Sequence, residues 1–238
     1  GFAGKVLEHI EIIPETLPTS QDDPSVQNLI NLFRIIPFFK DSSEGLSASI
    51  ATPEAVTILS RSFQPNETSV LNYQWAALAS IVNASTAQAI EGLSDRFFGI
   101  IDNQTYPYFT SYVESIIKIM GQLMTLDKDF AKKLIDWECG KKLGQLILNY
   151  PKHTLGHLAI TNFALKTLEI TDVPQLASSV LIPLFEIVQT SFQDEQPAEF
   201  RAFGFNLQKT VNDKIKESNL TVEIPALNQE TQDKIQNL

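Results

Sequence analysis

The chain has 238 residues, a formal charge of −10 at pH 7 and an isoelectric point near 4.8. This acidic composition argues against nucleic acid as a partner, because binding to phosphates draws on clustered Lys and Arg. No uninterrupted apolar run approaches the ~20 residues that a helix needs to cross a bilayer, so we predict no membrane span. The single cysteine, Cys139, excludes an intrachain disulfide and suits a reducing compartment.

The expected location is cytoplasmic, with the nucleus as the alternative. Four Asn-x-Ser/Thr triplets begin at Asn66, Asn83, Asn103 and Asn219. Such a triplet marks glycosylation only in a secreted protein. The chain opens with Gly1 instead of Met, so the lack of a leader peptide carries no information about targeting.

Helical periodicity runs along almost the whole chain. The first strong pattern, residues 23–39, has Asp23 as a capping residue and Pro24 in the first helical position. Further helices are predicted, in chain order, at residues 52–63, 71–84, 86–101, 109–124, 127–148, 154–169, 172–192 and 197–217. Residues 221–227 form the one candidate strand, and Pro225 weakens it. The predicted fold class is all-α.

Amide side chains recur in four of these segments, at Asn83, Gln122, Asn162 and Asn206. Their separations of 39, 40 and 44 residues are close to the period of about 40–47 residues in HEAT and armadillo repeats. Each amide-bearing helix follows another helix, at residues 52–63, 93–102, 140–150 and 179–189. Before three of these, a shorter helix is predicted to end near a turn, at Gly92, at Gly140 and before Leu181.

This order of helices resembles the armadillo family of α-solenoids over about residues 24–216. The stretch "LIPLFEIV" is similar to the second helix of such a repeat, and "AITNFA" and "ASIVNAS" are similar to the third. The resemblance implies a right-handed armadillo-like α-α superhelix of about four to five degenerate repeats. We divide the chain into an N-terminal extension (1–22), a repeat domain (23–217) and a C-terminal tail (218–238). A single globular helical bundle is the alternative.

The resemblance also implies a binding surface. Third helices of the family line a concave groove, where Asn side chains hold the backbone of an extended peptide. The family's best-known grooves add a Trp four residues before each Asn, whereas this chain has Ala79, Lys118, Leu158 and Ala202 there. This departure excludes a groove of the nuclear-localisation type. The candidate groove residues are Trp75 as an apolar anchor, Asn83, Lys118, Gln122, Asn162 and Asn206.

Enzymatic chemistry has little support in the sequence. His153 and His157 have the spacing of a zinc pair on a helix, but Thr154 stands where metallohydrolases place a Glu. Cys139 has Lys141 and Lys142 nearby, which would lower a thiol pKa, but no His partner by sequence. We therefore predict no catalytic residue, no metal and no cofactor.

The predicted function is a non-catalytic scaffold or adaptor that binds a protein or peptide on its concave face. The acidic charge favours a basic or neutral partner by electrostatic steering. One alternative is a regulatory subunit of an enzyme complex such as a phosphatase. A less favoured alternative is a helical metal-dependent hydrolase that uses His153 and His157. The sequence predicts no particular oligomeric state.

Overall fold

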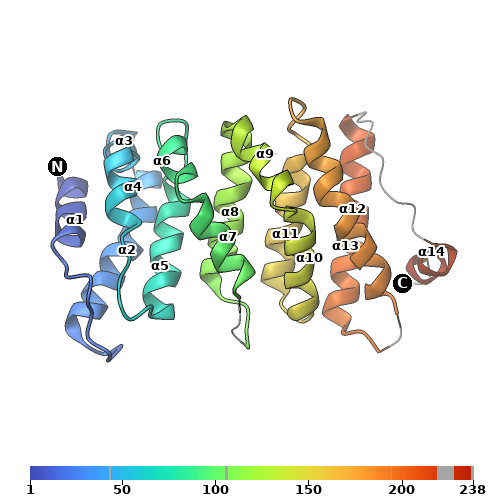
Figure 1. Cartoon of the computed structure of the whole chain (residues 1–238), viewed down its shortest axis with the longest axis horizontal. Coiled ribbons are helices and arrows are strands. Elements are labelled where there is room, and N and C mark those ends of the chain that lie inside the picture. The colour runs from blue at the N-terminus through green and yellow to red at the C-terminus, as the bar shows by residue number, and fades with distance from the viewer. Residues whose placement is uncertain (43, 105–106, 194, 219–227, 237–238) are drawn as a thin grey trace. The chain divides into compact units, whose positions relative to one another are not determined.

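The computed structural model describes the chain except for residues 43, 105–106, 194, 219–227 and 237–238 (Figure 1). Its helices are α1 (Phe2–Glu11), α2 (Pro24–Ser42), α3 (Glu44–Ile50), α4 (Pro53–Leu59), α5 (Thr68–Ser80), α6 (Ala87–Glu91), α7 (Ser94–Asp102), α8 (Ser111–Leu126), α9 (Lys128–Asp136), α10 (Cys139–Asn149), α11 (Thr154–Thr167), α12 (Pro174–Ser191), α13 (Ala198–Ser218) and α14 (Gln229–Gln236). Within these residues there is no β-sheet, only an isolated bridge between Thr16 and Gln64. The predicted all-α fold is confirmed, and the candidate strand at 221–227 lies outside the described residues.

Local signals set where several helices begin. The Thr52 hydroxyl accepts a hydrogen bond from the Ala55 amide at 3.2 Å, which caps α4. The Asp127 carboxylate accepts hydrogen bonds from the amides of Asp129 and Phe130 at 2.8 and 3.1 Å, which caps α9. Among the described helices, none combines the length and the apolar character of a membrane-spanning segment.

Nine of the described helices follow one another in three groups of three: α3–α4–α5, α6–α7–α8 and α9–α10–α11. In each group the third helix is the longest. The longer helix of each group is a predicted amide-bearing helix. The separate short helix predicted at residues 173–179 is wrong, because those residues form the start of the continuous helix α12. Pro174 occupies the first turn of α12, where a missing amide hydrogen costs nothing, and no glycine follows to end the helix.

Contacts divide the chain into two compact units. The first contains residues 1–100 and 110–126. In it α5 packs against α2 and α8, as the neighbouring ribbons in Figure 1 show. The aromatic side chains of Phe33, Trp75 and Phe97 are fully buried in this unit.

Helix α1 also belongs to the first unit and packs against α2, α3 and α4. It buries Ala3, Val6, Leu7 and Ile10. The Arg61 guanidinium donates hydrogen bonds to the carbonyl oxygens of Ile10, Glu11 and Ile13, at 2.8, 2.7 and 3.0 Å, so it satisfies carbonyls at the end of α1. The segment assigned to an extension thus contains a packed helix, while the domain boundaries at residues 22 and 217 stay a prediction.

The second unit contains residues 101–109 and 127–238, with α12 packed against α9, α10, α11 and α13. Glycines allow two of these contacts to be close. A Cβ atom on Gly140 of α10 would lie 2.5 Å from the Ser179 carbonyl oxygen, and one on Gly204 of α13 would lie 2.2 Å from the Ser191 hydroxyl. Gly140 was predicted to mark a turn, but the turn lies at Glu138, which has a φ of 57°.

Candidate functional site

An exposed stripe on α11 combines two leucines with an amide. Leu155 and Leu158 are 61% and 54% exposed, and Asn162 is exposed one turn further on. Their spacing of three and then four residues places them on one face of the helix. Ile160 and Phe163 are buried and anchor the opposite side of α11 in the core of the second unit. The stripe is therefore the exposed side of α11.

Helix α13, which packs beside α11, repeats this arrangement in a smaller form. Ala202 and Asn206 are exposed and four residues apart. Gly204 lies between them in sequence and contacts Ser191 of α12, so Ala202 and Asn206 lie on the side of α13 that faces away from α12. We call Leu155, Leu158, Asn162, Ala202 and Asn206 the amide face.

The two asparagine side chains of the amide face, Asn162 and Asn206, do not take part in the internal hydrogen bonds of the described residues. Neither carboxamide makes a hydrogen bond to another described residue, and both side chains are exposed. At Asn206 the main-chain carbonyl oxygen accepts a hydrogen bond from the Thr210 hydroxyl at 2.6 Å, so the carboxamide takes no part in it. An asparagine side chain has both a donor and an acceptor, so it can bind the N–H and C=O groups of a peptide backbone.

Two other predicted groove residues lie on α8, in the first unit. Lys118 is exposed, and Gln122 follows it by four residues on the same face. Gln122 is half-buried, and its Oε1 atom has no hydrogen-bond partner within the described part of the chain. This oxygen is enclosed by the protein, and leaving it without a donor costs about 1–3 kcal/mol.

Asn83 does not lie on a helix surface as predicted. Helix α5 ends at Ser80, and Asn83 follows in the turn before α6. Its side-chain oxygen accepts hydrogen bonds from the amides of Ser85 and Thr86 at 2.8 and 3.1 Å. The side chain therefore stabilises this turn, which corrects its assignment to a groove.

Trp75 is also corrected as an exposed anchor, because it is completely buried. Its ring packs edge-on against Phe97 at 5.6 Å, and the Arg96 guanidinium lies 4.9 Å from its centre. Burial lowers the pKa of Arg96, while this cation–π contact and the bond from Arg96 to the Ser60 carbonyl at 2.5 Å compensate for lost water. Trp75 is a core residue of the first unit.

The two histidines of the hydrolase hypothesis have separate structural roles. His153 caps α11, since its Nδ1 accepts a hydrogen bond from the Gly156 amide at 2.9 Å, and its ring stacks on Phe109. His157 is buried against Phe203, and its Nε2 lies 3.2 Å from the Tyr150 carbonyl oxygen. Burial lowers the pKa of His157. In the described residues no cluster of three His, Cys, Asp or Glu side chains surrounds this pair.

Cys139 has the environment of a structural thiol. It is buried at the start of α10, and burial raises its pKa well above the ordinary value. The two nearby lysines pair elsewhere: Lys141 binds Glu138, and Lys142 lies 2.8 Å from the Asp102 carboxylate. The thiol is therefore protonated at neutral pH and is not an activated nucleophile.

Leu155 was not among the residues predicted for the site, and Leu158 was noted only as the replacement for a Trp. A signal for them exists in the sequence. Apolar residues of the segment 154–169 lie on more than one face of the helix. A surface helix needs only one apolar face to pack on the core, so apolar residues on a second face indicate an exposed apolar surface.

Comparisons with known structures identify the fold. A designed armadillo repeat protein has a TM-score of 0.54 and 16% identity, covering 98% of this chain and 96% of its own. An engineered protein has a TM-score of 0.52 and 13% identity, covering 98% and 94%. A designed armadillo repeat protein in complex with the peptide (KR)4 has a TM-score of 0.51 and 14% identity, covering 99% and 97%.

No protein-family model matches this chain, and no curated protein sequence matches it either. At such low identities the structural likeness shows the fold and no specific activity. The predicted resemblance is confirmed at that level: this chain has the armadillo-repeat fold.

Proposed function

We propose that this protein is a non-catalytic scaffold or adaptor that binds an extended peptide segment of a partner protein on the amide face. The observation that carries the proposal is the pairing of an exposed apolar side chain with an unused amide on both helices, with leucines on α11 and Ala202 on α13. Leu158 lies one turn before Asn162, as Ala202 lies before Asn206. An apolar contact and a backbone hydrogen bond are thus offered at each step along the face.

The peptide complex of one structural neighbour supports this mode of binding, since that designed protein holds the peptide (KR)4 on the same fold. The net charge of −10 supports a basic or neutral partner for this chain through long-range steering. Lys118 and Gln122 on α8 remain candidates for a separate binding site within the first unit.

Leucine exposure alone does not make a site, because single exposed apolar residues are normal on protein surfaces. Leu155 and Leu158 differ from that background because they lie on one stripe that leads to Asn162. Leu148 on α10, which is 43% exposed, provides a matched control from another helix.

The test is selection of linear peptides from a random display library against the purified protein. The selected peptides should bind wild type and lose at least about tenfold in affinity to Leu158→Asp, because burying a charge at an apolar contact is costly. Leu148→Asp should bind as wild type does. Failure to select any peptide, or equal binding by both variants, would reject the amide face as the site.

A regulatory subunit of an enzyme complex would have the same fold and differ only in its partner. Co-purification with a stoichiometric catalytic chain would favour that role over an independent adaptor. We expect a cytoplasmic or nuclear location for either role, which microscopy of the tagged protein tests.

A further inference from the structure

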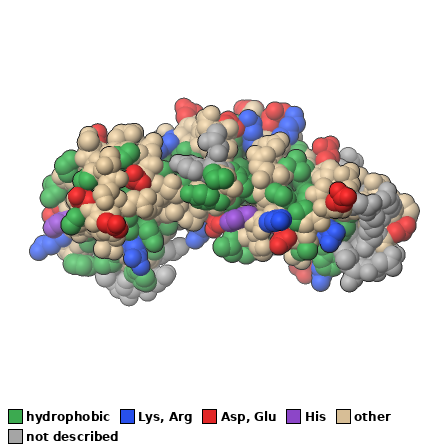
Figure 2. Space-filling model, turned by 90° about the horizontal axis from the view of Figure 1, so that it is seen from below, with side chains coloured by type: hydrophobic (Ala, Val, Ile, Leu, Met, Phe, Trp, Pro, Cys, Tyr) green, Lys and Arg blue, Asp and Glu red, His purple; other side chains and the backbone are tan. Residues whose placement is uncertain are grey.

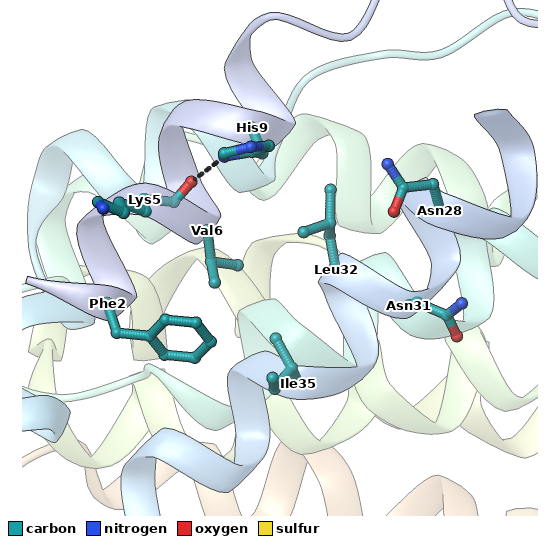
Figure 3. Close-up of a pocket in the computed structure, with 8 residues that line it drawn as sticks. All are labelled: Phe2, Lys5, Val6, His9, Asn28, Asn31, Leu32 and Ile35. Carbon is teal, nitrogen blue, oxygen red and sulfur yellow. Dashed lines mark hydrogen bonds between the residues drawn. The ribbon is translucent and has the colours of Figure 1, made fainter.

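A second surface feature lies far from the amide face in sequence, between α1 and α2. It is a cleft of about 360 Å³, which is within the range of about 300–1,000 Å³ typical of ligand sites. Its lining comes from four residues of each helix: Phe2, Lys5, Val6, His9, Asn28, Asn31, Leu32 and Ile35 (Figure 3). Both helices belong to the first unit.

The floor of the cleft is apolar. Phe2 and Val6 from α1 and Leu32 and Ile35 from α2 point toward the same hollow (Figure 3). The Phe2 side chain is 60% exposed although its ring makes an edge-on contact with Phe39 at 5.7 Å. A large part of this aromatic surface therefore remains in water, and a bulky apolar side chain that covered it would gain free energy.

The rim of the cleft is polar on both sides. Asn28 and Asn31 are exposed on α2, and their carboxamides make no hydrogen bond to other described residues. They lie three residues apart, on one face of the helix, where they can bind the N–H and C=O groups of one extended segment. These amides were not among the predicted groove residues.

The rim of the cleft carries one lysine. Lys5 is exposed on the α1 side, and no Asp or Glu is among the eight lining residues. His9 lies one turn further along α1, with its Nδ1 2.6 Å from the Lys5 carbonyl oxygen (Figure 3). The side chains seen from below in Figure 2 mix acidic and basic groups. Lys5 therefore offers one positive charge at the rim of the cleft, on a chain whose net charge is −10.

We propose that the α1–α2 cleft binds an extended peptide segment that carries a bulky apolar side chain beside a single carboxylate. The apolar side chain fills the floor, the carboxylate pairs with the Lys5 ammonium, and the peptide backbone binds Asn28 and Asn31. A run of several acidic residues does not fit, because the net charge of the chain repels it. One carboxylate in contact with Lys5 feels mainly that charge, since salt screens charges more than about 8 Å away. This site is independent of the amide face.

Two probe peptides that differ by one isosteric change test the proposal. They are acetyl-Gly-Leu-Phe-Asp-Gly-amide and the same peptide with Asn in place of Asp. Titration of each into the labelled protein, followed by amide NMR, gives the affinity and shows which helices are contacted. The Asp peptide should shift amides of α1 and α2 and bind about three- to fivefold more tightly than the Asn peptide, as expected for one exposed ion pair.

Two protein variants separate the charge effect from general effects. Lys5→Gln should abolish the preference for the Asp peptide while keeping the NMR spectrum of a folded protein, because Lys5 is exposed. Lys216→Gln, on the exposed surface of α13, removes the same charge elsewhere and should keep the preference. Leu158→Asp should also keep it, so loss of binding at the amide face is distinguishable from loss at the cleft.

Several results would overturn the proposal. They are equal affinity of the two peptides for wild type, shifts confined to helices other than α1 and α2, and no binding of either peptide at millimolar concentration. Tighter binding of a Lys-containing peptide would also overturn it, because that result would show that Lys5 does not determine the charge preference.

Discussion

The contact between α10 and α12 gives a sharp test of the packing in the second unit. An alanine Cβ at position 140 would lie 2.5 Å from the Ser179 carbonyl oxygen and 2.8 Å from the Val180 Cα and carbonyl oxygen. All three atoms belong to the main chain of α12, so no side-chain rotation relieves the clash. Gly140→Ala therefore forces the two helices apart.

The magnitude follows from two opposing effects. Overpacking of a close interface costs about 1–3 kcal/mol, because moving the helices apart weakens the contacts of buried Leu143 and Val180. Replacing a helical Gly by Ala gains at most about 1 kcal/mol of helix propensity. That gain is smaller here because Gly140 lies in the first turn of α10. We expect Gly140→Ala to lower the free energy of unfolding by roughly 1–3 kcal/mol.

Two other glycines supply graded controls. A Cβ on Gly144 would lie 2.2 Å from Ile187 Cδ1, the end of a flexible side chain, so Gly144→Ala should cost less than Gly140→Ala. A Cβ on Gly99 in α7 would meet nothing within 4 Å, so Gly99→Ala should gain up to about 1 kcal/mol. Urea unfolding at equilibrium measures all three, with an unchanged slope expected. A Gly140→Ala protein as stable as Gly99→Ala would refute the close approach of α10 and α12.

Two further predictions use side chains of known environment. Asn83→Ala should cost about 0.5–2 kcal/mol, because it removes the two hydrogen bonds that hold the turn before α6, whereas Asn162→Ala should change stability by less than about 0.5 kcal/mol. Urea unfolding measures both, and equal effects would contradict these two structural roles. Because burial lowers the pKa of His157, the unfolded chain binds the proton at a higher pH than the folded chain, and stability should fall as the pH decreases below about 6.5. Urea unfolding between about pH 7 and pH 5 should show this slope in wild type and in His9→Gln but a weaker slope in His157→Gln; an unchanged slope in His157→Gln would contradict it.

The order of the helices could be predicted because apolar residues recur at helical spacing in each segment and an amide recurs after 39, 40 and 44 residues. Asn162 and Asn206 fit this frame, because both are exposed on helices, the first on α11 and the second on α13. Asn83 does not fit this pattern, and the local sequence already indicates a turn there. Asn followed by Ala-Ser-Thr before a helix is typical of a capping turn, because a short side chain can accept from amides two and three residues later. The repeat spacing favoured a helical position for Asn83 over this turn.

Gly140 shows why contacts between distant segments could not be predicted. A glycine between two helical patterns indicates a turn, and a close helix contact also requires a glycine. Only the position of Ser179 distinguishes the two cases, and it is 39 residues away. The chain instead turns at Glu138, a residue that tolerates a positive φ poorly and whose sequence context gives no sign of it. Helix α1 was overlooked for a different reason: its apolar spacing is regular, but it lies outside the repeating region.

The pairs of residues four apart show how environment, more than spacing, determines what a side chain can do. His153 and His157 have the spacing of a metal pair, yet one caps α11 and the other is buried against Phe203. Leu158 and Asn162 have the same spacing on the same helix and are both exposed. The difference is the direction of each pair around α11, which is set by the side that buries Ile160. A function proposed for this helix must therefore use the leucine and asparagine stripe, because the histidine side already serves the fold.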